Sequence, residues 1–239
     1  VLLILGVPAL IAPVVAGESM RSHAIFMVLA STLFFGLCFT GKLTALHGVL
    51  FLGIMALAML LSFTGKLSLL DLEAEETSYR RVLGFPESPW YAWFFILFGA
   101  IILPLGASLT VDGATELAAG FGVPDAAIGA TIVALGTSLP ELSVTIMAAR
   151  HNQPGMAIGN AVGSNTMNIL VVLGATALFA DLPVPPRALR FDLWFMLACA
   201  LVLLVLILSG RPIGRKIGTL FVLAYLAYVA ITLGGITLV

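Results

Sequence analysis

Long runs of apolar residues dominate this sequence and restrict the folds open to it. A helix needs about 20 apolar residues to cross the hydrocarbon core of a bilayer. Runs of about that length lie at 22–41, 44–65, 91–111, 126–149, 156–180, 193–210 and 217–239. Residues 1–13 resemble the end of one more. A helix satisfies its backbone polar groups within one segment, so we predict an all-α, polytopic transmembrane helix bundle.

The composition agrees with a protein that has the lipid bilayer as its main partner. Hydrophobic residues make up 61% of the 239 residues and charged residues only 10%. The net charge of −1 includes no basic stripe, so we expect no nucleic-acid partner. We expect a multi-pass protein of a prokaryotic inner (plasma) membrane.

A polar stretch at 65–90 separates two hydrophobic blocks and is predicted to be a cytoplasmic loop. With that loop inside, eight Lys and Arg residues, among them Arg211, fall on the cytoplasmic side and three, among them Lys42, outside. This excess of basic residues in the cytoplasm favours the orientation.

Two segments of the chain resemble two others. "VLLILGVPALIA" at 1–12 aligns with "ILVVLGATALFA" at 169–180, and after a two-residue drift "GVLF" at 48–51 aligns with "GTLF" at 218–221. Two spans, 91–111 and 126–149, precede only the second copy, which indicates five spans per complete copy. An odd number of spans forces the copies into opposite topologies, as in many secondary transporters. Chance similarity between Leu-rich helices is the alternative.

These observations divide the chain into three parts. Residues 1–64 are predicted to be the remainder of a first repeat, namely the end of its third helix plus two helices. Residues 65–90 form the loop, and residues 91–239 form a second repeat of five helices. We expect the missing N-terminal part of the same chain to complete the first, incomplete repeat, so that residues 1–239 alone should not transport.

Within the span 126–149, a helix breaker lies beside an ionisable residue. Pro140 cannot donate to the carbonyl of Gly136, and a charge at the position of Glu141 costs roughly 2.5–3.5 kcal/mol in a bilayer. Thr137 and Ser138 lie on the helix face of Glu141. We predict that the helix opens here, so that carbonyl and hydroxyl oxygens join the carboxylate in a cavity.

The following span carries a second polar face. Asn160, Ser164 and Asn168 recur every four residues in "GNAVGSNTMN". Carboxylate, amide, hydroxyl and carbonyl oxygens are ligands for hard cations such as Ca²⁺ or Na⁺. For Asn165 and Thr145, interhelical hydrogen bonding remains an equal alternative. Asp112 and Glu116 are interpreted as a hydrated rim, with a cation-attracting vestibule as the alternative.

At "GTSLPE" (136–141) and "GNAVGSNTMN" (159–168) the chain resembles the calcium/cation antiporter superfamily, and in particular the second alpha repeat of a prokaryotic sodium/calcium exchanger. The resemblance implies a set of Na⁺ or Ca²⁺ ligands. That set consists of the Ala134 carbonyl, Thr137, Ser138, Glu141, Ser164 and Asn168. Many such exchangers have Asp where this chain has Asn168, which leaves K⁺ coupling and stoichiometry open.

The resulting functional hypothesis is secondary-active exchange of Ca²⁺ for Na⁺ through a midplane site by alternating access. A proton-coupled cation carrier or a cation channel using Glu141 is the alternative. We expect no cofactor beyond the transported Ca²⁺ and Na⁺. We expect no enzymatic activity, because no His or Lys at membrane depth is placed to activate Ser138 as a nucleophile.

Overall fold

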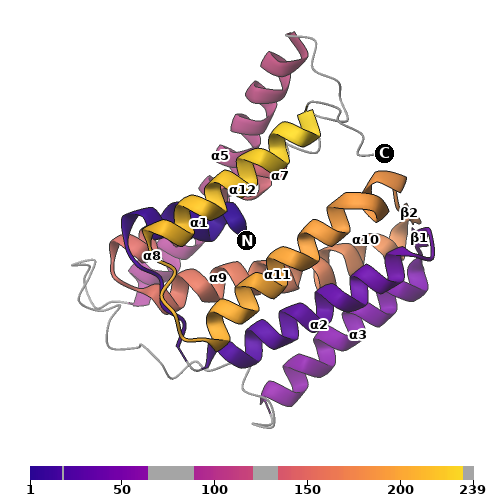
Figure 1. The fold of residues 1–239 in the computed structure, drawn as a ribbon, viewed down its shortest axis with the longest axis horizontal. Coiled ribbons are helices and arrows are strands. Elements are labelled where there is room, and N and C mark those ends of the chain that lie inside the picture. Colours follow the sequence, from indigo (N-terminus) through magenta and orange to yellow (C-terminus); the bar gives the residue numbers. More distant parts are fainter. Residues whose placement is uncertain (18, 64–88, 121–133, 234–239) are drawn as a thin grey trace.

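A computed structural model describes residues 1–17, 19–63, 89–120 and 134–233 of the chain. Helices run side by side in a bundle, with one long helix projecting from it (Figure 1). Five helices in the described part are long and apolar enough to cross a membrane: Met20–Cys38, Ala45–Ser62, Pro154–Phe179, Ala188–Leu208 and Arg215–Thr232. The predicted all-α membrane bundle is therefore confirmed.

The helices and strands follow one another in a simple order. In the N-terminal part these are α1 (Leu2–Ile11), α2 (Met20–Cys38), β1 (Lys42–Leu43) and α3 (Ala45–Phe63). The middle part contains α5 (Pro89–Gly120), α7 (Ala134–Thr137), α8 (Leu139–Arg150), α9 (Pro154–Met167), η2 (Asn168–Leu173) and α10 (Gly174–Phe179). The C-terminal part contains β2 (Leu182–Pro183), η3 (Ala188–Asp192), α11 (Leu193–Leu208) and α12 (Arg215–Leu233).

Two of the predicted spans differ from what the structure shows. The run at 91–111 is part of α5, which extends to Gly120, because the polar residues after 111 continue the helix beyond the apolar segment. Of the run at 126–149, the structure describes only residues from 134 onward, as two helices rather than one. The predicted loop at 65–90 lies almost entirely outside the described residues.

Two short antiparallel pairings join the ends of the bundle, and the internal alignment relates one to the other. Val14 pairs with Ile213, and Leu43 pairs with Leu182 in the β1–β2 ribbon. The alignment of the two copies equates Val14 with Leu182 and Leu43 with Ile213. Exchanging the copies therefore turns one pairing into the other.

Close helix crossings follow the same exchange. A Cβ on Gly6 of α1 would lie 3.1 Å from the carbonyl oxygen of Gly218 in α12. A Cβ on Gly48 of α3 would lie 2.6 Å from the carbonyl oxygen of Gly174 in α10. The alignment equates Gly6 with Gly174 and Gly48 with Gly218. Small residues let these backbones approach, as is common between membrane helices.

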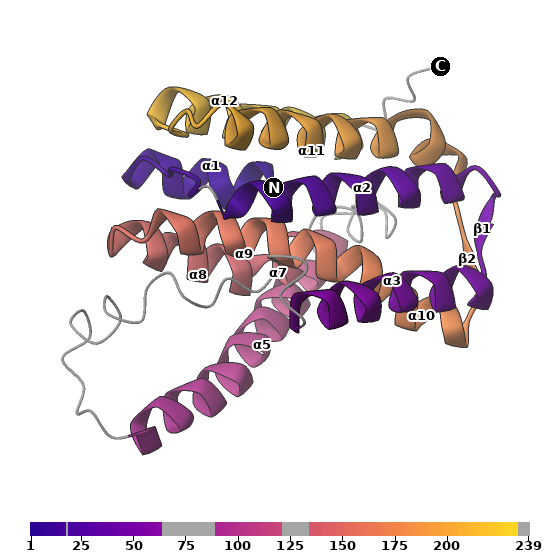
Figure 2. The same cartoon turned by 90° about the horizontal axis from the view of Figure 1, so that it is seen from below.

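Corresponding helices run in opposite directions. Helix α2 begins near the Val14–Ile213 pairing and ends near the β1–β2 ribbon, whereas its counterpart α11 begins after β2 and ends near Ile213. The two helices pack side by side (Figure 2). The two copies are therefore inverted relative to each other, as the odd number of spans predicted.

Candidate cation-binding site

The break between α7 and α8 is the centre of the candidate site. Ser138 separates the two helices, and its backbone N–H donates to the carbonyl of Leu135, three residues back, at 3.0 Å. Pro140 lies in the first turn of α8, where no N–H donor is needed. The break is therefore two residues earlier than the position of Pro140, because proline acts on the turn that precedes it.

Helix α5 crosses the chain at this break. A Cβ on the buried Gly136 would overlap the Cγ2 atom of Val111 in α5. Glycine is thus required at this position by a close approach of two helices as well as by the opened turn. Helix α5 also contacts α8, so it covers one side of the break.

Glu141 lies in the first turn of α8, close to the end of α7. Its side-chain oxygen Oε2 is buried and has no hydrogen-bond partner among the described residues. A helix N-terminus partly compensates a carboxylate through its dipole, whereas the end of α7 presents carbonyl oxygens. At the break, the N-terminus of α8 therefore stabilises a carboxylate, and the carbonyl oxygens at the end of α7 can attract a cation.

The backbone of Glu141 is held by two side chains. Asn160 Nδ2 of α9 donates to the Glu141 carbonyl oxygen at 3.0 Å. Thr145 Oγ1, which is fully buried, donates to the same oxygen and to that of Leu142, each at 3.0 Å. The Asn160 bond fixes the first turn of α8 against α9, whereas both Thr145 bonds lie within α8. The hydrogen bonds of Thr145 are therefore intrahelical and differ from the interhelical bonds considered for it.

The polar face of α9 lies beside α8 only in part. Ser164 is half-buried, and its Oγ donates to the carbonyl of Ala161 in the same helix at 3.3 Å. Asn165 Nδ2 donates to that same carbonyl at 2.6 Å. Asn168 is exposed and begins η2, a π-helical segment, where the helical register shifts.

The six residues of the implied ligand set thus have different environments. Ala134 begins α7, Thr137 ends it with an exposed side chain, and Ser138 is half-buried at the break. Within the described residues, no hydrogen bond joins the Glu141 side chain to Ser164 or Asn168. The structure brings α8 and α9 together at Glu141 and Asn160, one helical turn before Ser164.

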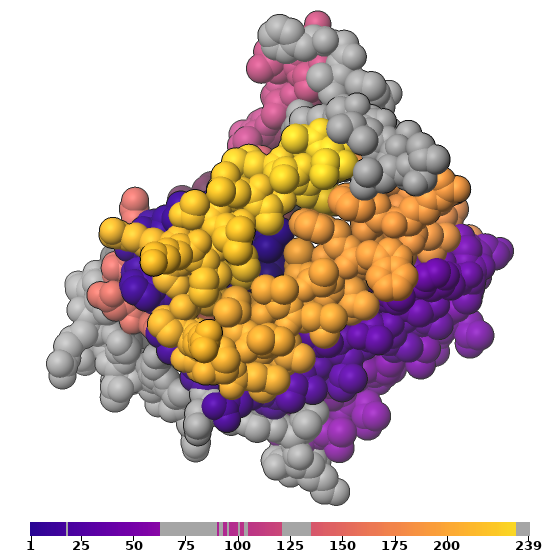
Figure 3. Space-filling model, in the orientation of Figure 1, coloured from indigo at the N-terminus to yellow at the C-terminus, as the bar shows by residue number. Residues whose placement is uncertain are grey.

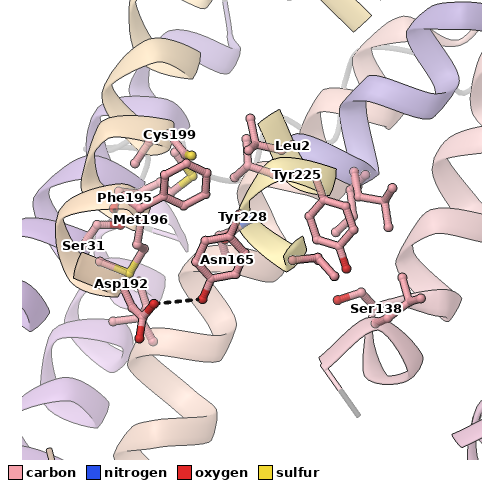
Figure 4. A pocket seen from close by; sticks show the side chains of 18 residues that line it. Leu2, Ser31, Ser138, Asn165, Asp192, Phe195, Met196, Cys199, Tyr225 and Tyr228 are labelled. Atoms are coloured by element: carbon pink, nitrogen blue, oxygen red, sulfur yellow. Dashed lines mark hydrogen bonds between the residues drawn. The ribbon is translucent and has the colours of Figure 1, made fainter. Parts of the chain in front are cut away.

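Ser138 also faces a pocket of about 420 Å³ on the other side of the break. Its hydroxyl points into this space (Figure 4), which Asn165 also lines. Helices α5 and α9 both contact α8, the helix that carries Glu141.

The donor set determines which ions the site can suit. The described residues contain no group of three or more His, Cys, Asp and Glu side chains that could hold a metal ion. Glu141 would supply one negative charge, and the remaining donors are neutral oxygens. A set of this kind suits Na⁺ or, with a further carboxylate, Ca²⁺.

Sequence reasoning placed Asn160 on the polar face but not among the ligands, and the four-residue spacing of Asn160 from Ser164 was the signal for it.

An apolar bundle with inverted halves and an interrupted helix defines an integral membrane transport protein. Residues 90–234 match the family model described as sodium/calcium exchanger protein. The chain belongs to this family.

Curated relatives agree with the family match. The chain is 33% identical over 233 residues to the putative antiporter CaxA of Alkalimonas amylolytica, a match that covers 95% of this chain and 73% of the relative. It is 30% identical to the inner membrane protein YrbG of Escherichia coli, covering 96% and 72% of the two chains. It is 29% identical over 138 residues to the sodium/calcium exchanger MaX1 of Methanosarcina acetivorans, covering 58% and 39%.

Solved structures of similar fold belong to the sodium-calcium exchanger NCX_Mj. A structure soaked with zero Na⁺ and Ca²⁺ is 28% identical, with a TM-score of 0.74, and the match covers 95% of this chain and 70% of that one. Another, soaked with 10 mM Na⁺ and 10 mM Sr²⁺, gives a TM-score of 0.75 at 27% identity and the same coverage.

Proposed function

We propose that this protein exchanges Ca²⁺ for Na⁺ by secondary-active antiport through the site at Glu141. The buried, unpartnered Oε2 of Glu141 is the observation that carries the proposal. A carboxylate oxygen removed from water without a partner is costly, and a bound cation would compensate it. The names of MaX1 and NCX_Mj as sodium/calcium exchangers support this choice of cations.

Competition of the two cations for one site would produce exchange. Ca²⁺ and Na⁺ would both use the Glu141 carboxylate, assisted by Ser138, Thr137, the Ala134 carbonyl and the polar face of α9 at Ser164 and Asn168. The occupied site would then open alternately to each side of the membrane, so that release of one ion requires binding of the other. Asn160 would keep the first turn of α8 in place while the ligands exchange.

The test is Glu141→Gln in the full-length protein reconstituted in proteoliposomes. Na⁺-gradient-driven ⁴⁵Ca²⁺ uptake should fall to background, because the amide keeps the shape of the carboxylate but removes its charge. Glu116→Gln is the matched control, since Glu116 is exposed on α5, and uptake should stay within about twofold of wild type. Retained uptake in Glu141→Gln would refute the assignment.

The same vesicles distinguish antiport from the alternatives. Antiport requires Na⁺ on the opposite side, a channel passes Ca²⁺ without any trans cation, and a proton-coupled carrier responds to a pH gradient without Na⁺.

A further inference from the structure

Exposed basic side chains gather at the end of the bundle that is marked by the Val14–Ile213 pairing. Segments 12–24, 147–157 and 207–218 lie at this end, where α1, α8 and α11 finish and α2, α9 and α12 begin (Figures 1 and 2). The beginning of α12 projects from it on the left of Figure 3. The exposed basic residues are Arg21, Arg150, Arg211, Arg215 and Lys216.

The two ends of the bundle differ in how their charges are balanced. The described residues of the three segments contain no Asp or Glu. When Glu18 is included, which lies outside the described residues, five basic residues still face one acidic residue, and the net charge is +4. At the β1–β2 end, by contrast, Lys42 pairs with Asp181 and Arg187 with Asp192.

Three of the basic residues lie close together in sequence where α11 leads into α12. Arg211 follows the end of α11, and Arg215 and Lys216 form the first turn of α12, which contains no acidic residue. Cations in the first turn of a helix are repelled by the helix dipole. Their own charges therefore do not stabilise α12, whereas an external anion would offset them. We call these three residues the basic turn.

The backbone holds the basic turn at the level of the bilayer surface. Only residues 209–214 separate the candidate spans Ala188–Leu208 and Arg215–Thr232. Val14 and Ile213 exchange backbone hydrogen bonds of 3.0 and 2.8 Å, which tie this short connection to the chain after α1. Basic side chains that directly flank a span reach the lipid headgroups.

We propose that the basic turn binds the headgroup of an anionic phospholipid. The positive charge that the described residues leave unbalanced is complementary to a phosphate that carries a net negative charge, and the turn lies at the depth of such headgroups. The inference goes beyond the proposed exchange of cations and does not depend on Glu141.

The experiment measures lipid binding to the full-length protein in a neutral detergent. Dioleoylphosphatidylglycerol, which is anionic, and dioleoylphosphatidylcholine, which has no net charge, are titrated separately, and each Kd is taken from the rise in melting temperature. We expect the Kd of the anionic lipid to be lower by about tenfold or more, since each basic residue near an anionic surface contributes roughly fivefold in affinity.

A triple variant, Arg211→Gln with Arg215→Gln and Lys216→Gln, should raise the Kd of phosphatidylglycerol about tenfold or more. Arg215→Gln alone should raise it about fivefold, which keeps the test available if the triple variant does not fold. Without lipid, the melting temperature of the triple variant should be unchanged or higher, because cations are removed from a helix N-terminus. A purely structural role predicts a lower melting temperature and an unchanged Kd.

The matched control removes three basic residues from the other end of the bundle. The variant Lys42→Gln with Arg187→Gln and Arg190→Gln changes the net charge by the same amount, and its Kd for phosphatidylglycerol should stay within about twofold of wild type, because distant charges are screened. Glu141→Gln should also keep the wild-type Kd, so that failure of the transport assignment is recognised separately.

The proposal is overturned if phosphatidylcholine binds as tightly as phosphatidylglycerol, if the triple variant keeps the wild-type Kd, or if the control variant loses affinity equally. An equal rise in melting temperature with sn-glycerol 3-phosphate would identify a soluble anion instead of a lipid. The acidic stretch "DLEAEE" at 71–76 is the competing occupant. If phosphatidylglycerol binds only after its four carboxylates are replaced by amides, that stretch covers the basic turn and the lipid assignment fails.

Discussion

Asn160 and Asn165 lie on the same helix, five residues apart, but their amides serve different partners. Asn160 donates across to the Glu141 carbonyl in α8, whereas Asn165 donates to Ala161 within α9. Only the first bond connects the helix that carries the carboxylate to its neighbour. The position of Glu141 should therefore depend on one of these two asparagines and not on the other.

Asn160→Ala should weaken Ca²⁺ transport more than Asn165→Ala does. Loss of one interhelical hydrogen bond costs about 1 kcal/mol, which corresponds to a roughly fivefold rise in the KM for Ca²⁺ if it is felt at the site. Initial rates of ⁴⁵Ca²⁺ uptake over a range of Ca²⁺ concentrations measure this. A KM that changes equally in the two variants would contradict the positioning role.

Sequence reasoning reached Glu141 because a charge beside a breaker in an apolar run has few structural explanations. It did not assign Asn160 a partner, because the acceptor is a backbone carbonyl on another helix. Which carbonyl an amide reaches depends on how α8 and α9 cross, and side-chain spacing does not contain that information. The exposure of Asn168 has the same origin, since the π-helical register of η2 depends on packing.

At the scale of one element, Pro140 and Pro154 occupy similar places. Each lies in the first turn of a helix, α8 and α9 respectively, where proline is well tolerated. Only Pro140 follows directly on another helix. Proline therefore keeps α7 and α8 separate, whereas at Pro154 it merely begins a helix after a loop.

Pro140→Ala should lower transport while leaving the fold intact. The new N–H can bond to the Gly136 carbonyl and close the break, which moves the carboxylate from its place. We expect at least a tenfold loss of Na⁺-dependent ⁴⁵Ca²⁺ uptake, with an unchanged or higher melting temperature in detergent. Pro154→Ala is the control, and a similar loss there would show that the break is not the cause.

The glycine crossings permit a stability test within a single helix. A Cβ on Gly48 would lie 2.6 Å from a backbone oxygen, whereas Gly53 on the same helix has no atom within 4 Å. Gly48→Ala should destabilise the protein by about 1–3 kcal/mol through overpacking, and Gly53→Ala should not. Gly218→Ala, the counterpart of Gly48, should behave like Gly48→Ala. Thermal unfolding in detergent measures all three.

At the scale of the whole molecule, the two ends of the bundle should lie on opposite sides of the membrane. The charge distribution places Lys42 outside and Arg211 in the cytoplasm, and the structure puts these exposed residues beside the two different pairings. In a cysteine-free background, Lys42→Cys should react with a membrane-impermeant maleimide on intact cells. Arg211→Cys should react only after the membrane is opened. Reaction of both from outside would contradict the orientation.

The arrangement of the whole chain was predictable where it depends on repetition. The alignment of a few residues around Gly6, Gly48 and their counterparts was enough to relate the copies, because close crossings tolerate little except glycine. Apolar length located the spans but not the extent of α5, whose last turns are polar. Hydropathy does not indicate where a helix ends once the helix extends beyond the lipid.

The paired crossings at Gly6–Gly218 and Gly48–Gly174 also bear on how such a molecule arises. Each copy supplies α1 or α10 to a surface formed by the last helix of the other, so neither copy completes its packing alone. Two separate, identical polypeptides inserted into the membrane in opposite orientations would make both contacts at once. A gene duplication that fuses such an antiparallel pair therefore preserves both crossings, and each half can afterwards diverge chemically from the other.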